Sequence, residues 1–251
     1  MRISDMRVHL VPLDLRTQYR EDIEPLRWDC VVVELISDEG VTGWSQPHYL
    51  GNGRSLAETL GGYIKQFVVG EDPRYPERIW RKVWAADRMG FMSMMAQGAV
   101  DVAVWDLNAK LADRPLYQLL GGYREKVRAY ASTTTLESVE AYRIQARQLV
   151  DDGFTAIKLH CWGIPDRDVE ACAAVRDEVG PHIDLMLDVV GTYTQDQAIR
   201  VGRSLEELGF HWYEEPLPHN DMYGYQKLFA ALDIPIAGCE LLGGGFYDYH
   251  A

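Results

Sequence analysis

The sequence lacks long apolar runs, paired cysteines and an excess of positive charge. None of its 251 residues belongs to an apolar run of about 18, and charges occur throughout the first sixteen residues, so we expect neither a transmembrane helix nor a signal peptide. The four cysteines are scattered without a CxxC spacing, which is typical of free thiols in a reducing cytoplasm. The net charge of −13 argues against nucleic acid or an anionic membrane as the main partner. These absences favour a cytoplasmic protein and are compatible with an anionic small substrate only if the site supplies its own cations.

What is present is an ordinary globular composition, 47% hydrophobic and 25% charged, whose pattern changes near residue 125. Before that point, residues 28–46 predict two strands joined by the turn SDEGVTG. Helical segments are predicted over 54–70, 77–88 and 95–122. In the last of these, Val100, Val104, Leu107 and Leu111 recur at intervals of three and four. We therefore predict an α+β domain over residues 1–125.

From about Val127 onward, predicted strands and helices alternate. The strands are predicted within residues 127–133, 155–160, 183–190, 211–216 and 235–240, and the helices within 138–153, 168–180, 194–209 and 223–233. Such alternation implies right-handed βαβ units and a parallel sheet, open or closed into a barrel. We therefore predict an α/β fold, with a second domain over residues 126–251 that contains this parallel sheet.

Charged residues stand at the ends of four of these strands. Lys158 and His160 share one face of the segment FTAIKLHCWG, at about 6 to 7 Å separation. Asp188, Glu214 and Glu240 end the next three strands at equal intervals of 26 residues. Because chemistry in parallel sheets lies at the carboxyl ends of the strands, the three carboxylates are expected to converge on one rim. Converging acids repel unless a cation neutralises them, and an all-oxygen site favours Mg²⁺, with Mn²⁺ less often used.

Each of these residues has a plainer interpretation when taken alone. A single acid at a strand end most often caps a helix or is solvated, Lys158 can extend to water, and His160 can be a hydrogen-bonded core histidine. The equal spacing of the three acids favours the metal interpretation. Glu215 follows Glu214 directly, so it must point the other way or cap the next turn, and we do not expect it to bind the metal.

With these motifs in place, the sequence resembles the enolase superfamily, in its mandelate racemase and muconate lactonizing enzyme branch. The resemblance covers essentially the whole chain: DEGVTGW, VGEDP, GAVDVAVWDLNAK followed by PLYQLLGG, IKLH, and the D, EEP and E strand ends. It implies an α+β capping domain and a TIM-like (β/α) barrel. It also implies Mg²⁺ on Asp188, Glu214 and Glu240, and a pair of basic residues at Lys158 and His160.

The implied chemistry is removal of the proton α to a carboxylate through an enediolate. A second negative charge then spreads onto the carboxylate oxygens, and Mg²⁺ together with Lys158 would stabilise that charge. We expect Lys158 to disfavour protonation of His160, which leaves a neutral imidazole as base or acid on one face of the substrate.

The sequence departs from the resemblance in two residues and in length. His160 stands where the family commonly has Lys, and Val190 follows Asp188 where relatives usually carry Asn. About 126 residues remain for a barrel that typically needs roughly 250. We therefore expect an incomplete barrel in a shortened chain, without the later strands that in this family carry the opposing acid or base.

Dehydration of an acid sugar is the predicted reaction, because the branch that the sequence resembles is rich in such dehydratases. A racemase, epimerase or cycloisomerase uses the same enediolate, and a metal-binding relative that lost its second acid or base is the non-catalytic alternative. His48 and Tyr49, in the loop QPHYLGNG, are predicted to contact the substrate. The expected partner is a small carboxylate, and the protein is expected to be a homo-oligomer.

Overall fold

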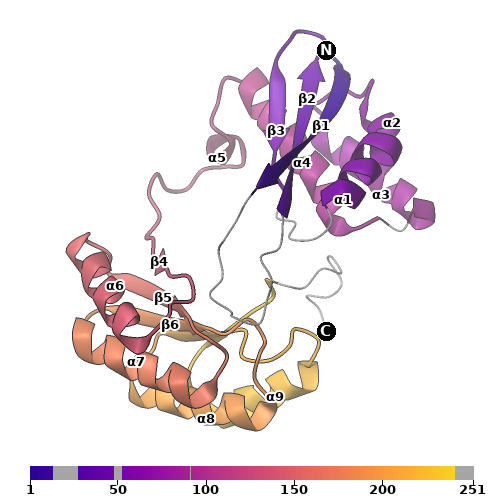
Figure 1. The fold of residues 1–251 in the computed structure, drawn as a ribbon. Helices are drawn as coiled ribbons and strands as arrows, with labels where there is room; N and C mark the ends of the chain where they lie inside the picture. Colours follow the sequence, from indigo (N-terminus) through magenta and orange to yellow (C-terminus); the bar gives the residue numbers. More distant parts are fainter. Residues whose placement is uncertain (14–27, 48–52, 91, 241–251) are drawn as a thin grey trace. The chain divides into compact units, whose positions relative to one another are not determined.

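The computed structural model describes residues 1–13, 28–47, 53–90 and 92–240 (Figure 1). These residues form two compact units, one up to residue 126 and the other from residue 127. Within the described ranges, the helices are all too short or too polar to cross a membrane.

The sheet of the N-terminal unit has three antiparallel strands in the order β1-β2-β3. They are β1 (Ile3–Leu13), β2 (Trp28–Ser37) and β3 (Thr42–Ser45). The sequence predicted β2 and β3 but not β1. In β1 the alternation of buried and exposed side chains is broken by a bulge between Ile3 and Asp5. As a result Ile3 and Met6, three residues apart, are both buried. Period-two reasoning misses a strand that begins in this way.

The described helices of this unit are α1 (Gly53–Glu58), the π-helix η1 (Thr59–Ile64), α2 (Lys65–Val68), α3 (Pro76–Gly90), α4 (Met94–Leu111) and α5 (Leu116–Leu119). Of these, α1, η1, α2 and α4 pack against the sheet, whereas α3 packs against α2 and α4, and α5 against α4. The predicted stripe of α4 is buried at Val100, Val104 and Leu107. A Cβ on Gly43 of β3 would lie 2.3 Å from the Ala103 carbonyl oxygen, so only glycine lets β3 approach α4 this closely.

The sheet of the C-terminal unit has five parallel strands in the order β4-β5-β6-β7-β8. The strands are β4 (Ala131–Ser132), β5 (Ala156–His160), β6 (Asp184–Asp188), β7 (Trp212–Glu214) and β8 (Ile236–Ala237). Each is followed by a helix except β8, as far as the described residues reach. Their order along the sheet is their order in the sequence, which is the arrangement that right-handed βαβ units produce.

Helices α6 to α9 lie together along one side of this sheet (Figure 1). They are α6 (Val139–Asp151), α7 (Pro165–Val179), α8 (Gln195–Glu207) and α9 (Met222–Ala231). Polar side chains cap the first turns of α6, α8 and α9, and α7 begins at a proline, which has no N–H to leave unpaired. These helices cover the strand residues that point toward them, including the fully buried Ile157 and Leu159. Lys158 and His160, at the alternate positions of β5, therefore face the opposite side of the sheet.

Candidate active site

Three carboxylates converge at the carboxyl ends of the C-terminal sheet. One oxygen from each of Asp188, Glu214 and Glu240 lies within 4.8 Å of the others. Asp188 and Glu214 are register partners on β6 and β7, and Glu240 lies just beyond β8. Residues in register on neighbouring strands point to the same face, which is why the 26-residue interval between Asp188 and Glu214 becomes proximity in space. The register partner of Glu214 on β8 is Ala237, so Glu240 reaches the cluster from three residues farther along the chain. Asp188 is 2% exposed, whereas Glu240 is exposed.

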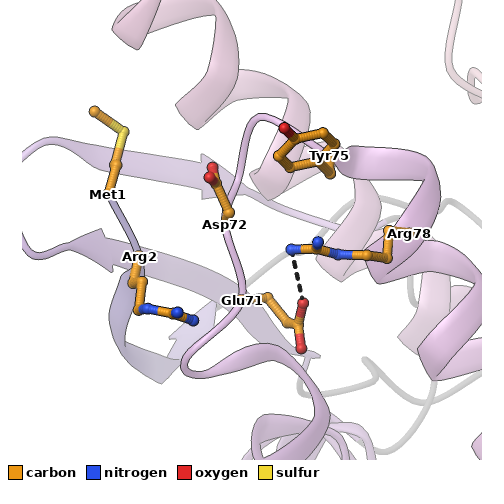
Figure 2. Close-up of a pocket in the computed structure, with 6 residues that line it drawn as sticks. All are labelled: Met1, Arg2, Glu71, Asp72, Tyr75 and Arg78. Atoms are coloured by element: carbon orange, nitrogen blue, oxygen red, sulfur yellow. Dashed lines mark ion pairs between the residues drawn. The ribbon is translucent and has the colours of Figure 1, made fainter.

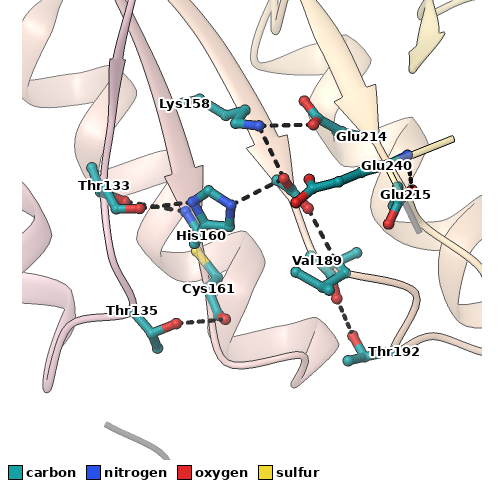
Figure 3. A network of polar contacts seen from close by, with 12 residues as sticks. Thr133, Thr135, Lys158, His160, Cys161, Val189, Thr192, Glu214, Glu215 and Glu240 are labelled. Atoms are coloured by element: carbon teal, nitrogen blue, oxygen red, sulfur yellow. Dashed lines mark hydrogen bonds and ion pairs between the residues drawn. The ribbon is translucent and has the colours of Figure 1, made fainter. Parts of the chain in front are cut away.

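Lys158 lies between two of these acids. Its ammonium donates to Asp188 Oδ2 at 3.0 Å and to Glu214 Oε1 at 2.7 Å (Figure 3). Burial alone would lower the pKa of Lys158, but the hydrogen bonds to Glu214 and Asp188 outweigh it and raise that pKa above its usual value. Lys158 therefore stays a cation and offsets the charge of the cluster.

His160 is held from both ring nitrogens. Nε2 lies 3.0 Å from Asp188 Oδ2, and Nδ1 lies 2.7 Å from the main-chain oxygen of Thr133 (Figure 3). Burial lowers the pKa of His160, yet the hydrogen bond and charge of Asp188 raise it more, and Lys158 lowers it only slightly. The net pKa is raised: the lowering expected from Lys158 is present, but Asp188, which contacts the ring directly, acts in the opposite direction and outweighs it.

The second carboxylate oxygens of Asp188 and Glu214 also accept hydrogen bonds. The main-chain N–H of Val190 donates to Asp188 Oδ1 at 3.1 Å, and the indole N–H of Trp212 donates to Glu214 Oε2 at 2.9 Å. Sequence reasoning missed Trp212. The signal was its position two residues before Glu214 on the same strand, where side chains share a face. These donors fix the orientation of both carboxylates.

Glu215 supports the cluster without joining it. Its side chain is 2% exposed, and Oε1 accepts a hydrogen bond from the main-chain N–H of Glu240 at 2.9 Å. Val190, Glu215 and Cys239, each within two residues of one of the acids, have positive φ angles of 50°, 41° and 85°. Such conformations are strained for side chains with a Cβ, and strain of this kind concentrates at functional sites.

The chemistry of these donors fits a hard divalent cation. The three carboxylates supply oxygen ligands only, and their mutual distances allow one small ion to contact all three. His48 and Tyr49, the predicted substrate contacts, lie outside the described residues.

A separate pocket of about 540 Å³ lies in the N-terminal unit (Figure 2). It is lined by Met1, Arg2, Glu71, Asp72, Tyr75 and Arg78. Its charges are paired: Glu71 with Arg78 at 3.2 Å and with Lys82 at 2.8 Å, and Asp72 with Arg74 at 2.6 Å. Its lining residues include two carboxylates, whereas three converge at the strand ends.

Comparisons with known proteins agree with this geometry. Residues 26–121 match the family model described as the mandelate racemase / muconate lactonizing enzyme N-terminal domain, and residues 141–250 match the model described as enolase C-terminal domain-like. The chain is 32% identical to D-galactarolactone cycloisomerase of Agrobacterium fabrum over 262 residues, which cover 100% of this chain and 68% of that protein. It is 34% identical to L-talarate/galactarate dehydratase of Salmonella typhimurium over 230 residues, which cover 84% of this chain and 55% of that one.

Solved structures agree as well. A racemase from Streptomyces coelicolor with bound magnesium superposes with a TM-score of 0.90 at 28% identity, covering 100% of this chain and 72% of that one. The chain belongs to the mandelate racemase / muconate lactonizing enzyme family of the enolase superfamily. The predicted fold, an N-terminal α+β capping domain followed by (β/α)-barrel elements, is thereby confirmed. The chain spans 55% to 69% of the length of the curated relatives it matches.

Proposed function

We propose that this chain carries the metal and proton-transfer residues for Mg²⁺-dependent removal of the proton α to a carboxylate, most specifically in the dehydration of an acid sugar. The observation that carries the proposal is the convergence of three carboxylates within 4.8 Å, beside a buried ammonium and an imidazole. Asp188, Glu214 and Glu240 would hold Mg²⁺, with Mn²⁺ as the alternative ion. When bound, the metal supplies positive charge next to the substrate carboxylate.

The protein's own groups would divide the remaining work. The ammonium of Lys158 is held in place by Asp188 and Glu214, so it needs no reorganisation to stabilise negative charge that develops on the substrate carboxylate. His160 would act at Nε2 as the acid or base on one face of the substrate, because its other ring nitrogen is already engaged by Thr133. To act as the base it first gives up the Nε2 proton that it donates to Asp188. In a dehydratase the enediolate then expels the β-hydroxyl group, which takes up a proton from the protonated His160 or from solvent and leaves as water.

The choice of dehydration rests on the relatives. They include L-talarate/galactarate dehydratase and arabinonate dehydratase, at 34% and 31% identity. D-galactarolactone cycloisomerase, at 32% identity over the whole chain, supports the second candidate, a cycloisomerase that shares the proton-abstraction step. Both candidates take a small carboxylate as partner. A cytoplasmic location, a homo-oligomer, the domain boundary at residue 125 and contacts from His48 and Tyr49 stay predictions.

The test is α-proton exchange in deuterated solvent over a panel of acid sugars and their lactones, with and without Mg²⁺. Exchange with loss of water supports the dehydratase, and exchange with a ring-opened or ring-closed isomer supports the cycloisomerase. His160→Asn is the matched control, because it removes the base and leaves all three acids. Mg²⁺ binding without exchange on any acid would overturn the enzymatic proposal in favour of a non-catalytic metal-binding relative.

A further inference from the structure

The end of β4 departs from regular parallel pairing at the point where it meets His160. Ala131 and Ser132 pair with Ile157 and Lys158, and the N–H of Thr133 donates to the Lys158 carbonyl at 2.9 Å. In a regular parallel ladder, the next bond would run from the N–H of His160 to the carbonyl of Thr133. That N–H donates instead to the side-chain hydroxyl of Thr133, at 3.1 Å.

This exchange of acceptors frees the Thr133 carbonyl. The carbonyl oxygen lies 2.7 Å from Nδ1 of His160, so one residue accepts from both the main chain and the ring of the histidine (Figure 3). A carbonyl can only accept, so Nδ1 must carry the proton of this bond. In a neutral imidazole, a proton on Nδ1 leaves Nε2 as the basic nitrogen. Thr133 is 6% exposed, which protects both bonds from competing water.

We propose that Thr133 is the positioning residue for His160: its hydroxyl replaces its own carbonyl in the strand ladder, and the freed carbonyl fixes the imidazole with Nε2 toward the acid cluster. This inference rests on the proposed role of His160 as the proton-transfer group. A residue with a β-hydroxyl is required at this position, since an apolar side chain leaves the N–H of His160 and its ring to compete for one carbonyl.

The experiment compares Thr133→Val, which keeps the shape and removes the hydroxyl, with Thr133→Ser, which keeps the hydroxyl. We expect Thr133→Val to lower kcat for α-proton exchange by about 10-fold or more with KM nearly unchanged, since small misplacements of a reacting group have effects of this order. Thr133→Ser should restore most of kcat. Thr135→Val is the matched control, because the Thr135 hydroxyl contacts the Cys161 carbonyl at 3.5 Å and not His160.

A spectroscopic measurement keeps this proposal separate from the proposed function. In ¹⁵N-labelled protein, the Nδ1–H signal of His160 should be visible and shifted downfield in the unsubstituted chain, in Thr133→Ser and in Thr135→Val, and weakened or lost in Thr133→Val. If no candidate substrate exchanges its α proton but this pattern of Nδ1–H signals holds, the enzymatic proposal fails and the positioning role stands. A Thr133→Val protein with unchanged kcat and an unchanged Nδ1–H signal overturns the inference. Should Thr133→Val fail to fold by circular dichroism, Thr133→Ala supplies the same comparison with a smaller side chain.

Discussion

The two units of this protein use similar ion pairs in opposite environments. In the N-terminal unit, Lys65 contacts Asp5 at 2.7 Å with side chains 40% and 37% exposed. In the C-terminal unit, Lys158 contacts Glu214 at the same distance with side chains 7% and 14% exposed. An exposed pair is screened by water and contributes little, whereas a buried pair needs both partners because either charge alone is costly to desolvate. Two ion pairs at equal distances therefore contribute differently, and the buried pair belongs to the group of charges to which we assign the function.

The largest expected effect comes from removing an acid of the buried cluster. Asp188→Asn should reduce Mg²⁺ affinity by more than about 100-fold. Loss of a residue that only hydrogen-bonds to a metal ligand already lowers affinity by up to about that factor, and Asp188 is assigned as a ligand itself. Isothermal titration calorimetry measures this, with Asp5→Asn as the matched acid-to-amide change in the other unit. Unchanged affinity in Asp188→Asn, Glu214→Gln and Glu240→Gln would remove these residues from the metal site.

Removing the imidazole should act on proton transfer rather than on the metal. His160→Asn is expected to lower α-proton exchange at one stereocentre by about 10²- to 10⁴-fold, the range that a positioned acid or base contributes. Mg²⁺ affinity should stay within a few-fold, because the three acids remain. Deuterium incorporation followed by NMR gives the first quantity. Full exchange activity in this variant would contradict the role assigned to His160.

Neutralising the buried ammonium tests the comparison of the two units directly. Lys158→Met leaves Asp188 and Glu214 facing each other, so metal-free protein should lose about 3–5 kcal/mol of unfolding free energy, part of which Mg²⁺ restores. Lys65→Met, the same change at an exposed pair, should cost about 0.2–1 kcal/mol. Urea unfolding with chelator and with Mg²⁺ measures both. Equal losses in the two variants would mean that burial does not distinguish the pairs.

The smallest expected effect is the pH dependence of the exposed pair. The hydrogen bond from Lys65 is the main cause that lowers the pKa of Asp5. A carboxyl whose pKa is lowered by folding stabilises the native state above its unfolded pKa, and this contribution is lost as the pH falls through the lowered value. The small difference in unfolding free energy between the unsubstituted protein and Lys65→Met should therefore be present at neutral pH and vanish in acid. A difference that grows on acidification would contradict the pairing.

Much of the C-terminal unit could be predicted from the sequence, because its elements repeat. All five strands fall within their predicted segments, and the 26-residue interval between Asp188 and Glu214 corresponds to one βα unit. In the N-terminal unit β1 was missed, since its bulge breaks the alternation on which strand prediction depends. The predicted helix over 54–70 is also interrupted by the π-helical turns of η1, which no periodicity of apolar residues indicates.

The candidate site divides in the same way. Asp188, Glu214 and Lys158 could be predicted as site residues from the sequence, because they are charged residues at strand positions where the alternation would normally place apolar side chains. Thr133 and Trp212 could not, because a threonine and a tryptophan are ordinary strand residues whose importance lies in which atom they contact. The direction of the pKa shift of His160 also depended on contact, since the nearest charge proved to be Asp188.

The sequence by itself determined the βα repeat, and with it the set of charged side chains that reach one edge of a parallel sheet, because alternation and equal spacing are properties of the chain. Only the tertiary structure decided which oxygen accepts a hydrogen bond from which donor. It showed that Lys158 donates to two acids, and that the Thr133 carbonyl accepts from the imidazole of His160. Hydrogen bonds depend on distances of a few tenths of an ångström between residues far apart in the chain, and those distances are set by the packing of the strands against one another.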